Sequence, residues 1–341
     1  MTKLLLSAVG LLILILDSKT AIQGAAEGVR QCIQTVIPAL FPTMVLSMMI
    51  TGNALGRTTS FIQKLCKPFG VPAGNESLLF VGLVGGYPTG AKCALQAYRN
   101  GSFDFNAYSR LLGFCSNAGP AFMFGMSAPF FESKADLWAL WIIHIISALS
   151  TAIILPQNSS SGKGTSIHSA QTLANVLPEA VKVMGITCGW IIAFKVLVSF
   201  CDRWFLWILP ETLRCMIYGL TELTNGILSL GSIPDDSLRF FVCSAMMAFG
   251  GLCVLMQTCS ITADSGLGDY LPGKLLQTCF SVIYSSLWNR IFRNSFNIII
   301  FITAIAVISF IIYILNRKKA KITVDFLTIF DYNVTRTNEA R

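Results

Sequence analysis

Charged residues are scarce in this sequence. Only 12% of its 341 residues are Asp, Glu, Lys or Arg, whereas 54% are hydrophobic. A soluble domain carries about a quarter charged residues, so this composition excludes an ordinary soluble globular protein. The mean hydropathy is +0.65, and uncharged apolar runs of membrane-spanning length recur along the chain. The composition therefore indicates an all-α polytopic membrane protein.

The sequence also lacks the residue patterns of a metal or redox site. It contains eleven cysteines but no C-x-x-C pair, and its two histidines are isolated. Most of the cysteines lie inside apolar segments, where a thiol acts as a small packing residue. We therefore expect no cofactor and no bound metal.

Neither nucleic-acid binding nor enzymatic activity is indicated. The formal net charge of +8 comes from basic residues in short loops and in the segment 316–321, without an aromatic-interleaved patch. Gly266-Leu267-Gly268-Asp269 matches the GxGD string of intramembrane aspartyl proteases, but that chemistry requires a second carboxylate, and no such partner is evident. We expect this string to form a loop. We also expect that the protein is not an enzyme and that membrane lipid is its surrounding partner.

Two places in the apolar sequence are rich in helix-breaking residues. The first is the segment 82–90, with four glycines and Pro88, and the second is Asn117-Ala118-Gly119-Pro120. Broken backbone survives at membrane depth only where it is buried in protein or lines a wet cavity, and many transporters build solute sites this way. We expect the two breaks to lie close together. The residues expected to line a solute site are Gly85, Gly86, Tyr87, Pro88, Gly90, Lys92, Ser116, Asn117, Gly119 and Pro120.

Several of these residues have a second interpretation. The spacing of Gly82, Gly86 and Gly90 also suits close helix packing, although Pro88 favours a re-entrant turn. Lys92 either extends to the membrane interface or faces the solute, and the amide of Asn117 either bonds a neighbouring helix or contacts the ligand.

Three further polar residues lie in apolar surroundings: His144, Lys195 and Glu222. His144 is in the middle of a predicted helix, where a packed histidine is commoner than a proton carrier. Lys195 either extends to the interface or pairs with Glu222.

The order of segments predicts five regions. Residues 1–26 form an anchor helix, 27–156 a first membrane half, 157–172 a flexible linker, 173–315 a second membrane half and 316–341 a basic cytoplasmic tail. We expect about eight to ten transmembrane or re-entrant segments. Within them, 92–106 is predicted as a polar connection, 136–156 as a helix, 270–289 as a spanning or interfacial segment and 296–315 as a span.

The second half repeats the first in outline. Glu27 and Glu179 each open an apolar helix, and Asp104 precedes one glycine-containing break as Asp235 precedes another at 249–251. The polar segment 218–231 corresponds to the Gly/Pro segment. Paired interrupted segments indicate an internal-repeat transporter.

The strings GLVGGYPTGAK (82–92) and SRLLGFCSNAGPAFMFG (109–125) resemble the YlbJ family of sporulation integral membrane proteins. These belong to a wider group with a nucleoside-recognition, or Gate, domain. The similarity extends over residues 27–150 and includes VIPALFP (36–42), Phe130-Phe131 and His144. Ser116 departs from the family, which often has Asn at that place.

The resemblance implies a multipass protein of the cytoplasmic or spore membrane of a Gram-positive bacterium, linked to formation of the spore envelope or cortex. Together with the broken segments, it predicts a transporter-like protein that binds or moves a small polar solute. The alternative is a structural or assembly protein of the spore envelope whose broken helices bind other membrane proteins.

Overall fold

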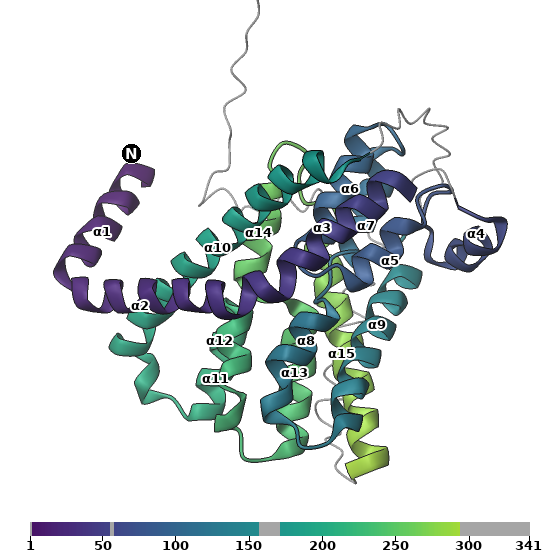
Figure 1. Ribbon diagram of the computed structural model, residues 1–341. Coiled ribbons are helices and arrows are strands. Elements are labelled where there is room, and N and C mark those ends of the chain that lie inside the picture. Colours follow the sequence, from purple (N-terminus) through teal and green to yellow (C-terminus); the bar gives the residue numbers. More distant parts are fainter. Residues whose placement is uncertain (1, 55–57, 157–170, 294–341) are drawn as a thin grey trace, which may run out of the picture.

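The structure, a computed structural model, describes residues 2–54, 58–156 and 171–293, and every regular element in these ranges is a helix (Figure 1). Residues 157–170 of the expected linker, the expected span 296–315 and the tail 316–341 lie outside the described residues.

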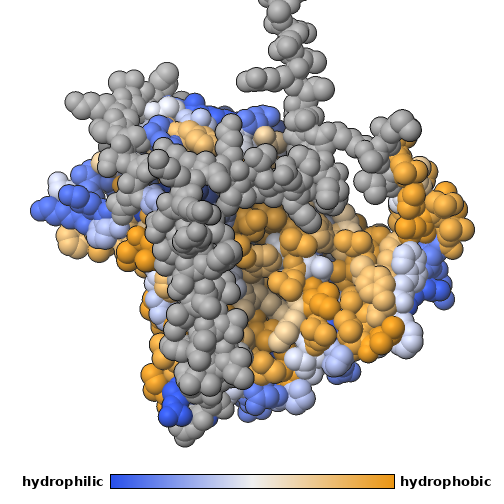
Figure 2. Space-filling view, turned by 180° about the vertical axis from the view of Figure 1, so that it is seen from behind, coloured by the Kyte–Doolittle hydropathy of each residue, from blue (hydrophilic) through white to orange (hydrophobic). Residues whose placement is uncertain are grey.

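Four described helices are long and apolar enough to cross a membrane: Ser18–Ala54, Lys134–Ile154, Leu173–Trp204 and Asp236–Thr262. Figure 2 shows a broad hydrophobic band with hydrophilic residues along its margins. The chain is an all-α polytopic membrane protein, as its composition predicted.

The N-terminal helix α1 (Thr2–Leu16) extends away from the rest of the fold (Figure 1). Asp17 caps α2 (Ser18–Gln31), which continues through the π-helical turn η1 (Cys32–Val36) into α3 (Ile37–Ala54). Pro38 has no N–H to donate, and a π-turn is one way in which a helix absorbs such a defect. The boundary expected at residue 26 falls inside this continuous helix.

The remainder of the first half consists of shorter helices followed by one long helix. The expectation that 92–106 is a polar connection is wrong for the first part of this segment, because Lys92 to Arg99 belong to a helix. These elements are α4 (Ser60–Cys66), η2 (Lys67–Phe69), α5 (Ser77–Val84), α6 (Thr89–Arg99), α7 (Phe105–Phe114), α8 (Pro120–Ser127), η3 (Ala128–Phe130) and α9 (Lys134–Ile154).

The second half begins with a long helix and then follows a similar order. The elements are α10 (Leu173–Trp204), η4 (Leu206–Ile208), α11 (Glu211–Thr221), α12 (Leu223–Leu228), η5 (Leu230–Ser232), α13 (Asp236–Phe249), α14 (Gly251–Thr262) and α15 (Tyr270–Arg293). The segment 270–289, expected to span or to lie at the interface, is part of a long helix that packs against α7, α9 and α13.

The same series of elements thus occurs twice: a long helix, a hairpin, a broken helix and another long helix. The hairpins are α5–α6 and α11–α12, and the broken helices are α7–α8 and α13–α14. Asp104 caps α7 and Asp235 caps α13, each through a side-chain oxygen. Glycines allow close approach within each hairpin, Gly90 lying against Gly82 and Gly226 against Gly219.

Long helices from the two halves hold the breaks at the centre of the fold. α10 packs along α2 and α3, while α15 packs against α7, α9 and α13 (Figure 1). Gly24 and Gly28 face the backbone of α10, where an added Cβ would lie within 3.0 Å of Val196 Cα or Ile192 Cα. This small-residue seam lets the two helices approach closely.

Candidate functional site

The turn between α5 and α6 is built from residues that tolerate unusual backbone. Gly86 has a positive φ of 82°, and the Tyr87–Pro88 peptide bond is cis. The Gly86 carbonyl accepts a hydrogen bond from the Thr89 N–H at 2.9 Å, where α6 begins. The Gly/Pro segment is therefore a tight turn between α5 and α6, and Tyr87 is the side chain that this turn presents.

The break between α7 and α8 lies directly against this hairpin. The Asn117 Nδ2 atom donates to the carbonyl oxygens of Gly82 at 2.8 Å and Phe114 at 2.7 Å. A Cβ added to Gly90 would lie 1.7 Å from the Cys115 carbonyl oxygen, so only glycine fits there. The predicted proximity of the two breaks is confirmed, and the Asn117 amide satisfies carbonyl groups that the break would otherwise leave unpaired.

Helix α15 brings a lysine and a glutamine to the same point, and we call Asn117, Lys274 and Gln277 the first cluster. The Asn117 Oδ1 atom accepts from Gln277 Nε2 at 2.8 Å and from Lys274 Nζ at 3.3 Å. Lys274 Nζ also donates to Gln277 Oε1 at 2.7 Å and to the Tyr87 hydroxyl at 3.2 Å. All three side chains are buried, and every amide atom of Asn117 and Gln277 has a hydrogen-bond partner. The first cluster is a closed network.

His144 supports the break from α9. Its Nε2 atom accepts the Ala118 N–H at 3.1 Å, which supplies a partner to a backbone group freed by the break. Its Nδ1 atom has no partner among the described residues. The structure therefore gives His144 a packing role at the break, in line with its commoner interpretation.

A second network of the same composition is centred on Asn225 in the second hairpin, and we call Asn225, Lys195 and Gln31 the second cluster. The Asn225 Oδ1 atom accepts from Lys195 Nζ at 2.7 Å and from Gln31 Nε2 at 3.1 Å. Asn225 and Gln31 are buried, but Asn225 Nδ2 and Gln31 Oε1 have no partner among the described residues. Lys195 thus bonds Asn225 rather than Glu222.

Glu222 occupies the turn of the second hairpin, where it starts α12. Its Oε1 and Oε2 atoms accept the N–H groups of Thr224 at 3.0 Å and Asn225 at 2.8 Å. A carboxylate in this position satisfies exposed N–H groups at a helix start. The side chain is nevertheless buried, and it has no ion-pair partner among the described residues.

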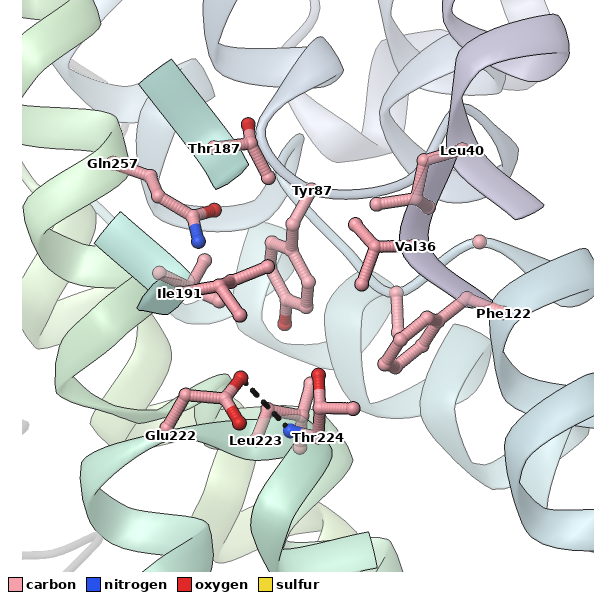
Figure 3. Close-up of a pocket in the computed structure, with 13 residues that line it drawn as sticks. Val36, Leu40, Tyr87, Phe122, Thr187, Ile191, Glu222, Leu223, Thr224 and Gln257 are labelled. Carbon is pink, nitrogen blue, oxygen red and sulfur yellow. Dashed lines mark hydrogen bonds between the residues drawn. The ribbon is translucent and has the colours of Figure 1, made fainter. Parts of the chain in front are cut away.

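One small cavity lies between the breaks of the two halves (Figure 3). Its volume is about 30 Å³, which is room for about two water molecules. Figure 3 shows the ring of Tyr87 in the middle of the group, with Glu222 and Thr224 from the second hairpin across from it. The lining residues are Val36, Leu40, Tyr87, Ala118, Gly119, Phe122, Thr187, Ile191, Glu222, Leu223, Thr224, Val254 and Gln257.

The structure gathers most of the expected site residues but separates one of them. Tyr87 and Gly119 line the cavity, whereas Asn117 is enclosed in the first cluster. Lys92 lies elsewhere, since its Nζ atom pairs with Glu179 Oε2 at 2.7 Å in a partly exposed contact. The remaining expected residues form the backbone of the two breaks: Gly85, Gly86, Pro88, Gly90, Ser116 and Pro120.

Sequence reasoning did not find Lys274, Gln277 or Gln31, and it indicated Asn225 only as one of the polar residues that interrupt the segment 218–231. The available signal in α15 was a stripe of polar residues on one helical face. The members of this stripe are Lys274, Gln277, Ser281 and Ser285, and all four are buried.

Comparison with known proteins gives one relation. The chain is 22% identical to the sporulation integral membrane protein YlbJ of Bacillus subtilis (strain 168) over 326 residues, which covers 80% of this chain and 79% of that protein. No family model matches the chain. No solved structure matches it either. The similarity to YlbJ is low, but it extends over most of both chains and supports a YlbJ-like relation.

Proposed function

We propose that this protein is a multipass membrane transporter of a small polar solute. The observation that carries the proposal is the cavity, because three backbone breaks meet around it. Tyr87 comes from the first hairpin, Ala118 and Gly119 from the α7–α8 break, and Glu222 from the second hairpin. Discontinuous helices from two halves of a chain are a recurrent way to build a solute site within a membrane.

The lining has the chemistry of a polar binding site. Glu222, Thr187, Thr224 and Gln257 supply carboxylate, hydroxyl and amide groups beside aliphatic side chains. A few polar groups in an otherwise apolar cavity are typical of small-molecule sites. The volume of about 30 Å³ admits only about two waters, so this conformation is the closed one, and a solute enters when the hairpins separate from their neighbours.

A non-transport role in assembly of a membrane complex is the competing proposal. The closed first cluster favours it, since a fully bonded interior is what a rigid scaffold requires. The two proposals differ in whether water and reagents ever reach the cavity.

Cysteine labelling in intact membranes separates these proposals. Thr187 is buried and lines the cavity, whereas Thr258 is equally buried but does not line it. We expect a Thr187→Cys variant to react with a membrane-impermeant thiol reagent added to either side. A Thr258→Cys variant should react from neither side beyond the parent protein. Absence of Thr187→Cys labelling from both sides would support the scaffold instead.

We further propose that the protein acts in sporulation, on the basis of its similarity to YlbJ. The resemblance of the segment Gly82–Lys92 to the YlbJ family points the same way. The test is expression in a Bacillus subtilis strain that lacks YlbJ, with heat-resistant spores counted. The Ile191→Trp variant, whose larger side chain fills the cavity, should not restore heat-resistant spores. The Leu197→Trp variant, on the exposed face of the same helix, should restore as many as the parent protein.

A further inference from the structure

The second cluster adjoins the cavity. Thr187, Ile191 and Lys195 follow one another at intervals of four along α10, so the face that lines the cavity continues to the cluster. Glu222 lines the cavity and bonds the backbone of Asn225. None of the three cluster residues lines the cavity, but Glu222 and this face of α10 connect the cluster to the proposed solute site.

Two atoms in this group have no hydrogen-bond partner among the described residues. One is a donor, Asn225 Nδ2, and the other is an acceptor, Gln31 Oε1. Both side chains are more than nine-tenths buried, at 4% and 5% exposure. A buried polar group without a partner costs about 1–3 kcal/mol, so two of them on side chains that bond each other indicate a place that a polar molecule completes.

Two opposite charges flank these atoms without pairing to each other. Lys195 Nζ donates to the neutral Asn225 amide, and the Glu222 carboxylate accepts from backbone N–H groups. Neither forms an ion pair within the described part of the chain. The residues that bond Asn225 thus offer a cation, a carboxylate and the free acceptor of Gln31, and Asn225 itself offers a free donor.

We propose that the second cluster and Glu222 bind the charged end of a small zwitterion. Its carboxylate accepts from Lys195 and Asn225 Nδ2, and its ammonium donates to Glu222 and Gln31 Oε1. A ligand of this class satisfies both unpartnered atoms and both charges at once, whereas an anion alone leaves the buried Glu222 charge unpaired and a cation alone leaves the half-buried Lys195 unpaired. The inference rests on the proposed function and names the substrate class.

The test is calorimetric binding to the purified full-length protein in lipid nanodiscs. Glycine is the probe, because acetate and methylamine carry its two charged groups separately. We expect glycine to bind at least tenfold more tightly than either fragment. Equal or weaker binding of glycine would overturn the inference.

Variants then assign the binding to this cluster. Gln31→Met removes the free acceptor and keeps a side chain of similar length, and it should weaken glycine binding at least tenfold. Gln277→Met makes the same change in the first cluster and should leave glycine affinity within about twofold of the parent. If Gln31→Met binds glycine like the parent, the cluster is not the site.

A second substitution tests whether Lys195 binds the ligand carboxylate, and it leaves the buried amides unchanged. Lys195 is only half-buried, and Lys195→Met should abolish the preference for glycine over methylamine. A retained preference would contradict the assignment of the ligand carboxylate to Lys195. Should glycine fail to bind while Thr187→Cys is labelled from both sides, the zwitterion inference falls and the transport proposal stands. Labelling from neither side removes the transport proposal itself.

Discussion

The two clusters share a composition and differ in completeness. In each, the Oδ1 atom of an asparagine in a broken segment accepts from a lysine and a glutamine on long helices. In the first cluster, every amide atom of Asn117 and Gln277 is bonded. In the second, Asn225 Nδ2 and Gln31 Oε1 have no partner among the described residues.

The difference teaches which break is structural and which is available to a ligand. A satisfied buried network fixes the elements it joins, so the first cluster locks the α5–α6 hairpin, the α7–α8 break and α15 together. An incomplete network is stabilised when a polar partner enters and bonds its free atoms. Under the proposed function, the first cluster is a latch, meaning a network that fixes the broken segments in place, and the second hairpin carries the binding groups.

Removal of the central amide of the first cluster should have the largest effect. Asn117→Leu leaves Lys274 and Gln277 without their common acceptor, and it leaves the Gly82 and Phe114 carbonyls without their donor. We expect a loss of about 3–5 kcal/mol. The variant should accumulate poorly in membranes and unfold at a much lower temperature when purified. Normal accumulation with the unfolding temperature of the parent would contradict a structural role for the first cluster.

The equivalent change in the second cluster should cost less stability. Asn225→Leu deprives Lys195 and Gln31 Nε2 of an acceptor, but Lys195 is half-buried and its long side chain can turn its amine toward other groups. We expect a loss of about 1–2 kcal/mol, seen as a moderate fall in unfolding temperature, together with loss of solute binding. A loss as large as that of Asn117→Leu would show that both clusters are latches.

The two glutamines give the smallest and most closely matched comparison. Gln277→Met removes two bonded atoms and should destabilise the protein by about 1–2 kcal/mol. Gln31→Met removes one bonded and one unpartnered atom, so its effect should stay within about 0.5 kcal/mol. Thermal unfolding of both variants in one detergent checks this order. The reverse order would contradict the assignment of the unpartnered atoms to a ligand site.

The sequence indicated the breaks because their signals are local. Glycine frees the backbone and proline restricts it wherever they occur, so the Gly/Pro turn and the Asn117 break were found in the right places. The repeat stays a prediction; superposition of residues 27–125 on 179–256 tests it, and the recurring order of elements and glycine-paired hairpins support it.

Long-range partners were beyond the reach of local patterns. Lys274 lies 157 residues from Asn117, and Gln31 lies 194 residues from Asn225. The sequence around each of these residues does not indicate a partner so far along the chain. Lys92 stood beside the Gly/Pro turn in sequence, yet α6 carries its side chain to Glu179 instead. Proximity in sequence is a poor guide once a hairpin reverses the chain direction.

Hydrogen–deuterium exchange on the unmodified protein in nanodiscs tests the central contrast most directly. Backbone amides in a closed network open rarely, whereas those in an incomplete one open more often. The amides of residues 222–226 should exchange at least tenfold faster than those of residues 115–119. Equal exchange in the two breaks, or faster exchange at residues 115–119, would contradict the account of a latch in the first half and a binding site in the second.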